Sequence, residues 1–140
     1  KIVQAFTFEA AHRLPRVPAS HRCNRLHGHS YRVELTLAGP VDPQSGFVTD
    51  FFDVEAAFAP VKERLDHRLL NEVPGLENHT AETIAMWIWR EVKPALPLLA
   101  AVSVAETPDC RAVYEADRRP PWGTDWRTHP EPECRSFSPR

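Results

Sequence analysis

The sequence has few cysteines, no excess of positive charge and no long hydrophobic run. Three cysteines among 140 residues are too few, and odd in number, for a disulfide framework, so we expect a protein of the reducing cytoplasm. Lys and Arg number 17 against 19 Asp and Glu, and a formal net charge of −2 argues against a nucleic-acid partner. No apolar stretch approaches the roughly 20 residues that a membrane-spanning helix needs, so no membrane partner is expected.

The chain has the length of one ordinary domain followed by a tail of different composition. A chain of 140 residues can bury one modest core but not two. From residue 118 onward, proline, arginine and isolated aromatic residues occur without periodicity, and five of the 14 prolines lie in the last 21 residues. We therefore expect a domain over residues 1–117 and a Pro-rich tail over residues 118–140, docked through Trp122 and Trp126.

Alternating apolar and polar residues predict the strands. Residues 2–8 are apolar or β-prone, and residues 30–37 alternate cleanly, so each segment is expected to form a strand. Residues 47–49 are expected to pair back onto the second strand. Residues 102–106 and 112–115 then indicate a hairpin at the end of the domain.

Two helices are predicted between these strands. The first is expected to be capped by Asp53, to bury an apolar stripe ending at Leu65, and to bend or split at Pro60. The second is expected to start after the cap Thr80 and to stop before Pro94. This order of elements predicts an α+β domain, in which an antiparallel four-stranded sheet carries both helices on one face.

Three of the seven histidines are candidates for a metal site. His27 and His29 lie two residues apart at the entry to the second strand, so their side chains point to one face and can bind one ion. His12 follows the first strand and can supply a third imidazole. Three imidazoles with an open fourth position are typical of catalytic zinc, whereas Cys23 as a fourth ligand would make a structural site. Simple solvated loop positions are predicted for His21, His79 and His129.

Two further positions carry carboxylates that need an explanation. Asp66 and His67 end the first helix, where they either interact with the helix dipole or form a relay that serves Cys23 as nucleophile or base. Glu106 has the strand parity of the apolar valines before it, so its carboxylate faces the core and needs a partner. That partner is either Arg111, across the hairpin, or a planar ligand whose two N–H groups a carboxylate can accept.

Four motifs together resemble the 6-pyruvoyltetrahydropterin synthase family. In chain order they are Phe8-Glu9-Ala10-Ala11-His12-Arg13-Leu14, Cys23-x3-His27-Gly28-His29, Leu65-Asp66-His67 and the strand end Glu106-Thr107. The resemblance extends over residues 2–117, and the tail has no counterpart in the family domain. Within the family, the spacing of three residues between Cys23 and His27 is most similar to that of the 6-carboxy-5,6,7,8-tetrahydropterin synthase branch. This branch belongs to queuosine (7-deazaguanine) biosynthesis.

The resemblance implies a fold, an assembly and a reaction. The fold is the tunnelling fold, in which the sheets of several subunits join into a barrel, commonly in a homohexamer built as a dimer of trimers with active sites at subunit interfaces. The reaction converts 7,8-dihydroneopterin triphosphate to 6-carboxy-5,6,7,8-tetrahydropterin, with release of triphosphate and acetaldehyde.

The same resemblance implies roles for individual residues. His12, His27 and His29 would bind Zn²⁺, and Cys23 would be the proton acceptor. The pair Asp66-His67 would form the relay, and Glu106 would anchor the pterin. Two other functions stay open: 6-pyruvoyltetrahydropterin synthase itself, with the same substrate, and a non-enzymatic interaction module stabilised by zinc.

Overall fold

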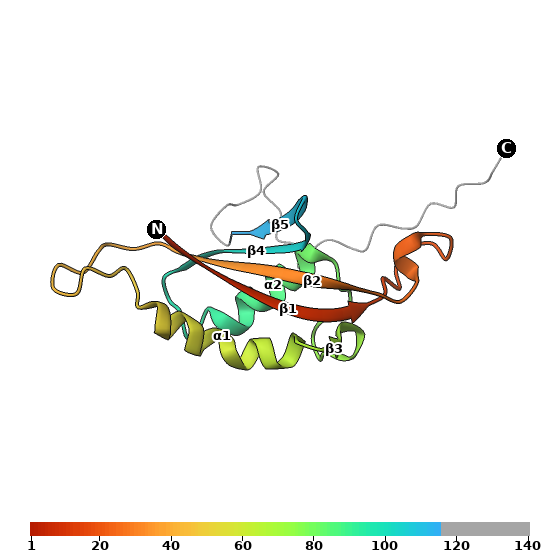
Figure 1. Cartoon of the computed structure of the whole chain (residues 1–140), viewed down its shortest axis with the longest axis horizontal. Helices are drawn as coiled ribbons and strands as arrows, with labels where there is room; N and C mark the ends of the chain where they lie inside the picture. Colours follow the sequence, from red (N-terminus) through yellow and green to blue (C-terminus); the bar gives the residue numbers. More distant parts are fainter. Residues whose placement is uncertain (116–140) are drawn as a thin grey trace, which may run out of the picture.

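The computed structural model describes residues 1–115, which form one five-stranded sheet with two helices on one face (Figure 1). The order across the sheet is β3-β1-β2-β4-β5, and every pairing is antiparallel except the parallel pair of β3 with β1. The predicted α+β class and the single helical face are confirmed. The strands are β1 (Ile2–His12), β2 (His27–Leu37), β3 (Arg68–Leu69), β4 (Leu99–Thr107) and β5 (Cys110–Tyr114).

The two central strands, β1 and β2, are longer than predicted. They were expected over residues 2–8 and 30–37, but they pair without interruption from Ile2 opposite Leu37 to His12 opposite His27. The inward residues of β2 are fully buried from Tyr31 to Leu37, as the alternation predicts. The extensions place all three candidate histidines on regular strand rather than in loops.

The first helix, α1 (Phe51–Leu65), differs from its prediction at its cap and at its proline. Asp50, not Asp53, is the N-cap, and its carboxylate accepts a hydrogen bond from Phe52 N at 2.9 Å. The helix also continues through Pro60 as one element. Pro60 and Ala56 are both exposed, so the Ala56 carbonyl that loses its helical partner can bond to water instead.

The second helix, α2 (Ala81–Val92), begins after the cap Thr80 and ends before Pro94, as predicted. Both of its central tryptophans are buried against other elements. Trp89 meets Tyr114 of β5 edge to face, with ring centroids 5.5 Å apart, and Arg64 of α1 lies over the Trp87 ring at 4.5 Å. The helix is therefore fixed to both the sheet and α1.

The sheet has one strand more than the predicted four. His67 has a left-handed φ of 57°, which turns the chain after α1 so that Arg68–Leu69 pairs with Ala10 and Ala11 of β1. Two residues are too few to produce a periodic sequence signal. Residues 47–49, which were expected to pair with β2, form no strand, and that prediction is wrong.

The core lies between the sheet and the two helices. It is built from inward residues of β1, β2 and β4 and from the buried stripes of α1 and α2. No helix among residues 1–115 is long and apolar enough to cross a membrane. The predicted docking of Trp122 and Trp126 lies outside the described residues. Fully buried members of the core include Val33, Leu35, Leu37, Val54, Phe58, Leu65, Ile84 and Ile88.

Candidate metal centre and substrate cavity

The three predicted metal ligands come together at one end of the sheet. His12 ends β1 directly opposite His27 at the start of β2, and His29 lies one inward position further along β2. Their ring nitrogens lie within 4.8 Å of one another. All three side chains lie on the face covered by the helices, because inward positions alternate along both strands.

The hydrogen bonds of these rings leave their Nε2 atoms free for an ion. His12 Nδ1 lies 2.9 Å from the carbonyl oxygen of His79, and His27 Nδ1 lies 2.7 Å from that of Arg25. Because a carbonyl can only accept, both Nδ1 atoms carry the proton and both Nε2 atoms present lone pairs. These two Nε2 atoms are only 3.0 Å apart, and His29 Nε2 is buried with no hydrogen-bond partner among the described residues. A divalent cation among the three nitrogens would resolve both features, so the donor set fits a metal ion.

The surroundings of His12 and His29 favour a neutral imidazole, which is the form that binds metal, by lowering the pKa of both rings. Burial, together with the neighbouring His27, lowers the pKa of His12 to about 4. Burial also lowers the pKa of His29, although the nearby Glu106 carboxylate acts in the opposite direction. A ring that is already deprotonated near neutral pH does not have to lose a proton before it binds a cation.

Glu106 lies beside this centre, at the end of β4, and the predicted structural partner is wrong. Arg111 pairs with Ala105 in the hairpin register, and its guanidinium binds Glu34 at 3.2 Å instead of Glu106. Within residues 1–115 no cationic side chain forms an ion pair with the half-buried Glu106 carboxylate, whose charge acts on His29 and Tyr31. The carboxylate is therefore available to a ligand.

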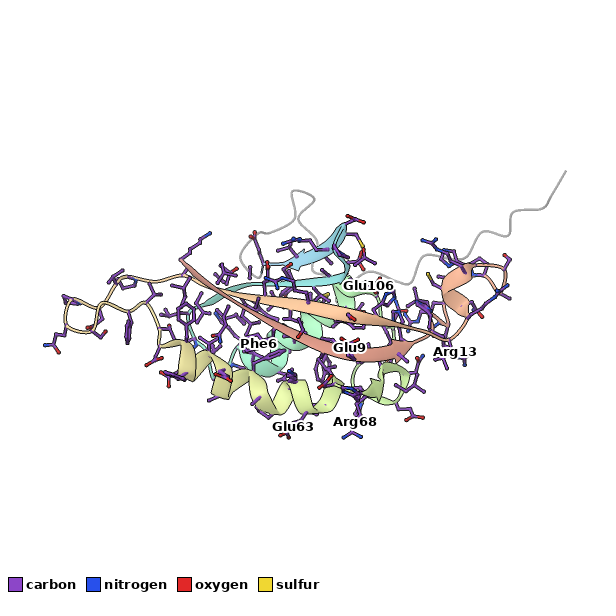
Figure 2. All side chains as sticks on the ribbon, viewed as in Figure 1. Phe6, Glu9, Arg13, Glu63, Arg68 and Glu106 are labelled. Atoms are coloured by element: carbon purple, nitrogen blue, oxygen red, sulfur yellow. The ribbon has the colours of Figure 1, made fainter. Side chains whose placement is uncertain are left out.

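A cavity of about 290 Å³ opens next to this carboxylate. Figure 2 shows Glu106 near the end of the sheet where Arg13 follows β1. The cavity walls come from the loop after β1, the start of α2 and the hairpin of β4 and β5. Its lining residues are Leu14, Thr80, Ala81, Glu82, Glu106, Cys110, Arg111 and Ala112.

Cys23 is held by a short 3-10 turn (Arg22–Asn24) in the loop between β1 and β2. Its carbonyl accepts from Leu14 N at 2.8 Å, and its amide donates to the ring of His21 at 3.1 Å. The Asn24 amide group binds the carbonyls of Leu14 and Val17 and pins the same loop. The thiol is free and half-buried, and its sulfur is not part of the cluster of metal-ligand atoms.

The pair Asp66-His67 lies on the other face of the sheet. One Asp66 carboxylate oxygen accepts from Glu9 N at 2.9 Å and lies 3.0 Å from His67 Nδ1, and the Glu9 amide is the main reason that the pKa of Asp66 is lowered. The His67 side chain is 78% exposed and lines a groove of about 530 Å³ with the outward residues Gly28 and Ser30, and with His29 between them, whose side chain has the inward parity of its strand. The predicted contact between Asp66 and His67 is present. Within a single chain, however, this pair does not lie next to the three candidate metal ligands.

Two residues that contact His12 were not predicted to do so. His79, predicted to be a solvated loop residue, is 1% exposed, and its carbonyl orients His12. Nothing in the local sequence signals this burial, because it depends on how the turn before α2 docks. Tyr31 is also buried, with its hydroxyl 3.3 Å from His12 Nδ1, and burial together with Glu106 raises its pKa. Its spacing, two residues after His29 on the same strand face, could have revealed it.

The fold and this site define a single-sheet α+β domain with three histidines that could hold a metal ion and a cavity lined by Glu106, whose carboxylate forms no ion pair within residues 1–115. A sequence model of the 6-pyruvoyl tetrahydropterin synthase family matches residues 1–117, and the chain belongs to this family. Its solved relatives share the tunnelling fold, as predicted: the 6-pyruvoyl tetrahydropterin synthase of Caenorhabditis elegans superposes with a TM-score of 0.75 at 28% identity, covering 81% of this chain and 93% of that one.

Relatives that are named for different activities match the sequence. The 6-carboxy-5,6,7,8-tetrahydropterin synthase of Synechocystis sp. is 40% identical over 126 residues, which cover 86% of this chain and 96% of the relative. The 6-pyruvoyl tetrahydrobiopterin synthase of Drosophila melanogaster is 35% identical over 119 residues, 73% of this chain and 71% of the relative. These matches therefore show that the chain belongs to a family of pterin synthases.

Proposed function

We propose that this protein is a zinc-dependent 6-carboxy-5,6,7,8-tetrahydropterin synthase. It converts 7,8-dihydroneopterin triphosphate to the carboxy pterin with release of acetaldehyde and triphosphate, as a lyase of cytoplasmic queuosine (7-deazaguanine) biosynthesis. The observation that carries the proposal is a group of three imidazoles that could hold a metal ion, close to the Glu106 carboxylate, whose charge acts on His29. The Cys-x3-His spacing and the Synechocystis relative favour the carboxy product.

In this proposal Glu106 binds the flat edge of the pterin. A carboxylate accepts two parallel N–H bonds, and a pterin offers two such donors at its 2-amino group and N3. The cost of leaving a carboxylate half-buried without a cation is offset when these donors arrive. Glu106 thus fixes which end of the substrate faces the metal centre.

The residues His12, His27 and His29 hold the zinc ion. Three nitrogen ligands leave a fourth position for substrate oxygen, as in catalytic rather than structural sites. When bound, zinc supplies a Lewis acid that polarises the substrate hydroxyls. The carbonyls of His79 and Arg25 keep two of the rings in the tautomer that this role requires.

Cys23 is the proposed proton acceptor, with Asp66 and His67 as its relay. Because His67 lies on the sheet face away from the metal centre, the relay that completes a site comes from a neighbouring copy of the chain. Two sheet edges favour such an assembly, since β5 is an outer strand and β3 covers only the end of β1. A homohexamer, built as a dimer of trimers with active sites at the interfaces, would bring His67 of one copy to the Cys23 of another and would also cover the two sheet edges.

A second candidate function is 6-pyruvoyltetrahydropterin synthase, which is favoured by the names of the Drosophila and nematode relatives. Incubation of the zinc-loaded protein with 7,8-dihydroneopterin triphosphate, followed by mass spectrometry, distinguishes the two. We expect acetaldehyde and the carboxy pterin. A product that keeps the whole carbon side chain would assign the second function, and no turnover, with unfolding by a chelator, would support a zinc-stabilised interaction module.

The roles of Cys23 and His67 can be tested by single variants and then by mixing. Cys23→Ala should keep zinc and lower turnover by about 10²- to 10⁴-fold, the usual loss for a general acid or base. Loss of metal in this variant would instead assign Cys23 as a ligand. Hexamers co-assembled from Cys23→Ala and His67→Ala subunits should recover activity in about a quarter of their sites if the two residues meet across an interface. No recovery would contradict the shared site.

A further inference from the structure

The N-terminus of helix α2 is built on the turn that holds a metal ligand. The side-chain oxygen of Thr80 accepts from Thr83 N at 3.4 Å, which makes Thr80 the N-cap. The Thr83 hydroxyl reaches back to the carbonyl of Asn78 and lies 3.0 Å from that of Thr80. Thr83 thus ties together both ends of the turn formed by residues 78–80.

The middle residue of this turn is the one that orients His12. The His79 carbonyl accepts from His12 Nδ1 at 2.9 Å, and this contact decides that Nε2 faces the other two ligands. The buried His79 ring also helps to hold the turn in place. Both ring nitrogens are buried without a partner in hydrogen-bonding geometry among residues 1–115, although the carbonyls of Arg13, Leu70 and Leu76 lie near the ring.

The same turn also reaches the substrate cavity, because Thr80 and Ala81 line it beside Glu106. A shift of the turn would therefore move a metal ligand and a cavity wall together. Packing of the His79 ring limits this shift, but the hydroxyl of Thr83 is the side-chain group that binds the backbone on both sides of residue 79.

We propose that Thr83 is a positioning residue for the metal centre, acting through the 78–80 turn and the His79 carbonyl on the ring of His12. Thr83 touches neither a ligand ring nor Glu106 in any contact of the described residues. Its effect is on the orientation of His12, and hence on the affinity of the three histidines for a divalent cation. The inference rests on the metal centre of the proposed function.

The test measures zinc affinity by competition with a chromophoric chelator, independently of turnover. Thr83→Val keeps the shape of the side chain and removes the hydroxyl, and we expect roughly tenfold weaker zinc binding, the lower end of the range for partners of metal ligands. Thr83→Ser restores the hydroxyl and should bind zinc within about twofold of the wild type. Thr83→Ala is a second loss-of-hydroxyl variant in case the valine disturbs folding.

The matched control is Asp50→Ala, which removes the N-cap of α1 far along the chain from the metal ligands. It should lower the melting temperature, because it removes a capping interaction, but leave zinc affinity unchanged. Nitrogen-15 NMR of the imidazoles should detect the change at His12 in Thr83→Val and none in Asp50→Ala.

Four outcomes would overturn an assignment, and they separate the inference from the function. Equal zinc affinity in wild type and Thr83→Val, or equal losses in Thr83→Val and Asp50→Ala, would show that the Thr83 hydroxyl only stabilises the start of α2. Failure of Thr83→Ser to restore affinity would also contradict the role of the hydroxyl. A wild-type protein that binds no zinc would instead remove the metal centre and with it the proposed function.

Discussion

Acidification of the metal-free protein is expected to destabilise it strongly, because His12 is buried as a neutral ring whose pKa is lowered. The pKa of His12 falls from an ordinary 6.5 to about 4 in the folded protein. Above pH 6.5 the ring is neutral in both states and contributes no pH dependence. Between pH 6.5 and about 4 the unfolded chain takes up a proton that the folded chain does not, so stability is lost as the pH falls.

The size of this effect follows from the pKa difference. A difference of about 2.5 pKa units, at 1.36 kcal/mol each, corresponds to about 3 kcal/mol, and below about pH 4 the contribution levels off. The pKa values of His29 and His79 are lowered by burial as well, so their contributions have the same sign. Since ordinary domains are stable by about 5–15 kcal/mol, the loss should be large on this scale.

The assay is urea unfolding of the chelated protein at a series of pH values from 7.5 to 4.5. His12→Gln is the matched variant, because an amide can still donate to the His79 carbonyl but does not titrate in this range. We expect its stability curve to be flatter by about the 3 kcal/mol assigned to His12. Parallel curves for wild type and His12→Gln would refute the assignment of the acid sensitivity to this ring.

Three further changes test the site and the core. His29→Ala should lose stoichiometric metal while its circular dichroism spectrum stays native, and metal retained in elemental analysis would contradict a three-histidine site. Glu106→Gln should raise KM and lower turnover, because an amide presents its own N–H to one pterin donor; an unchanged kcat/KM would leave Glu106 a structural role only. Phe8→Ala removes the ring stacked on Tyr31 at 4.7 Å and should cost about 3–5 kcal/mol in urea unfolding, so a loss below about 1 kcal/mol would show that the site repacks.

Local sequence patterns were sufficient to predict features that depend on a single helix or strand. The cap Thr80 and the apolar stripe that follows it predict α2 correctly, since capping and helical period act within a few residues. Alternation predicts β2, and with it the common face of His27 and His29. Asp50 was missed as the cap of α1 because two aspartates three residues apart offer the same local signal.

Contacts between distant segments required the tertiary structure. The burial of His79 depends on the turn before α2 docking against His12, 67 residues away in the sequence. The fifth strand exists because His67 turns the chain back onto β1, and a two-residue strand has no period of its own. Which face of the sheet carries the Asp66-His67 pair follows from that same turn.

The sequence by itself thus predicted the three histidines that could hold a metal ion, both helices, four of the strands and the family, because spacing along a strand or helix fixes which side chains share a face. Only the tertiary structure decided that Arg111 is bound to Glu34, so that Glu106 has no ion pair within residues 1–115, that a backbone carbonyl orients His12, and that His67 lies on the sheet face away from the three histidines. Each of these features depends on the packing of segments far apart in the chain. Hydrogen bonds to backbone carbonyls cannot be predicted from residue types, because every residue has such a carbonyl.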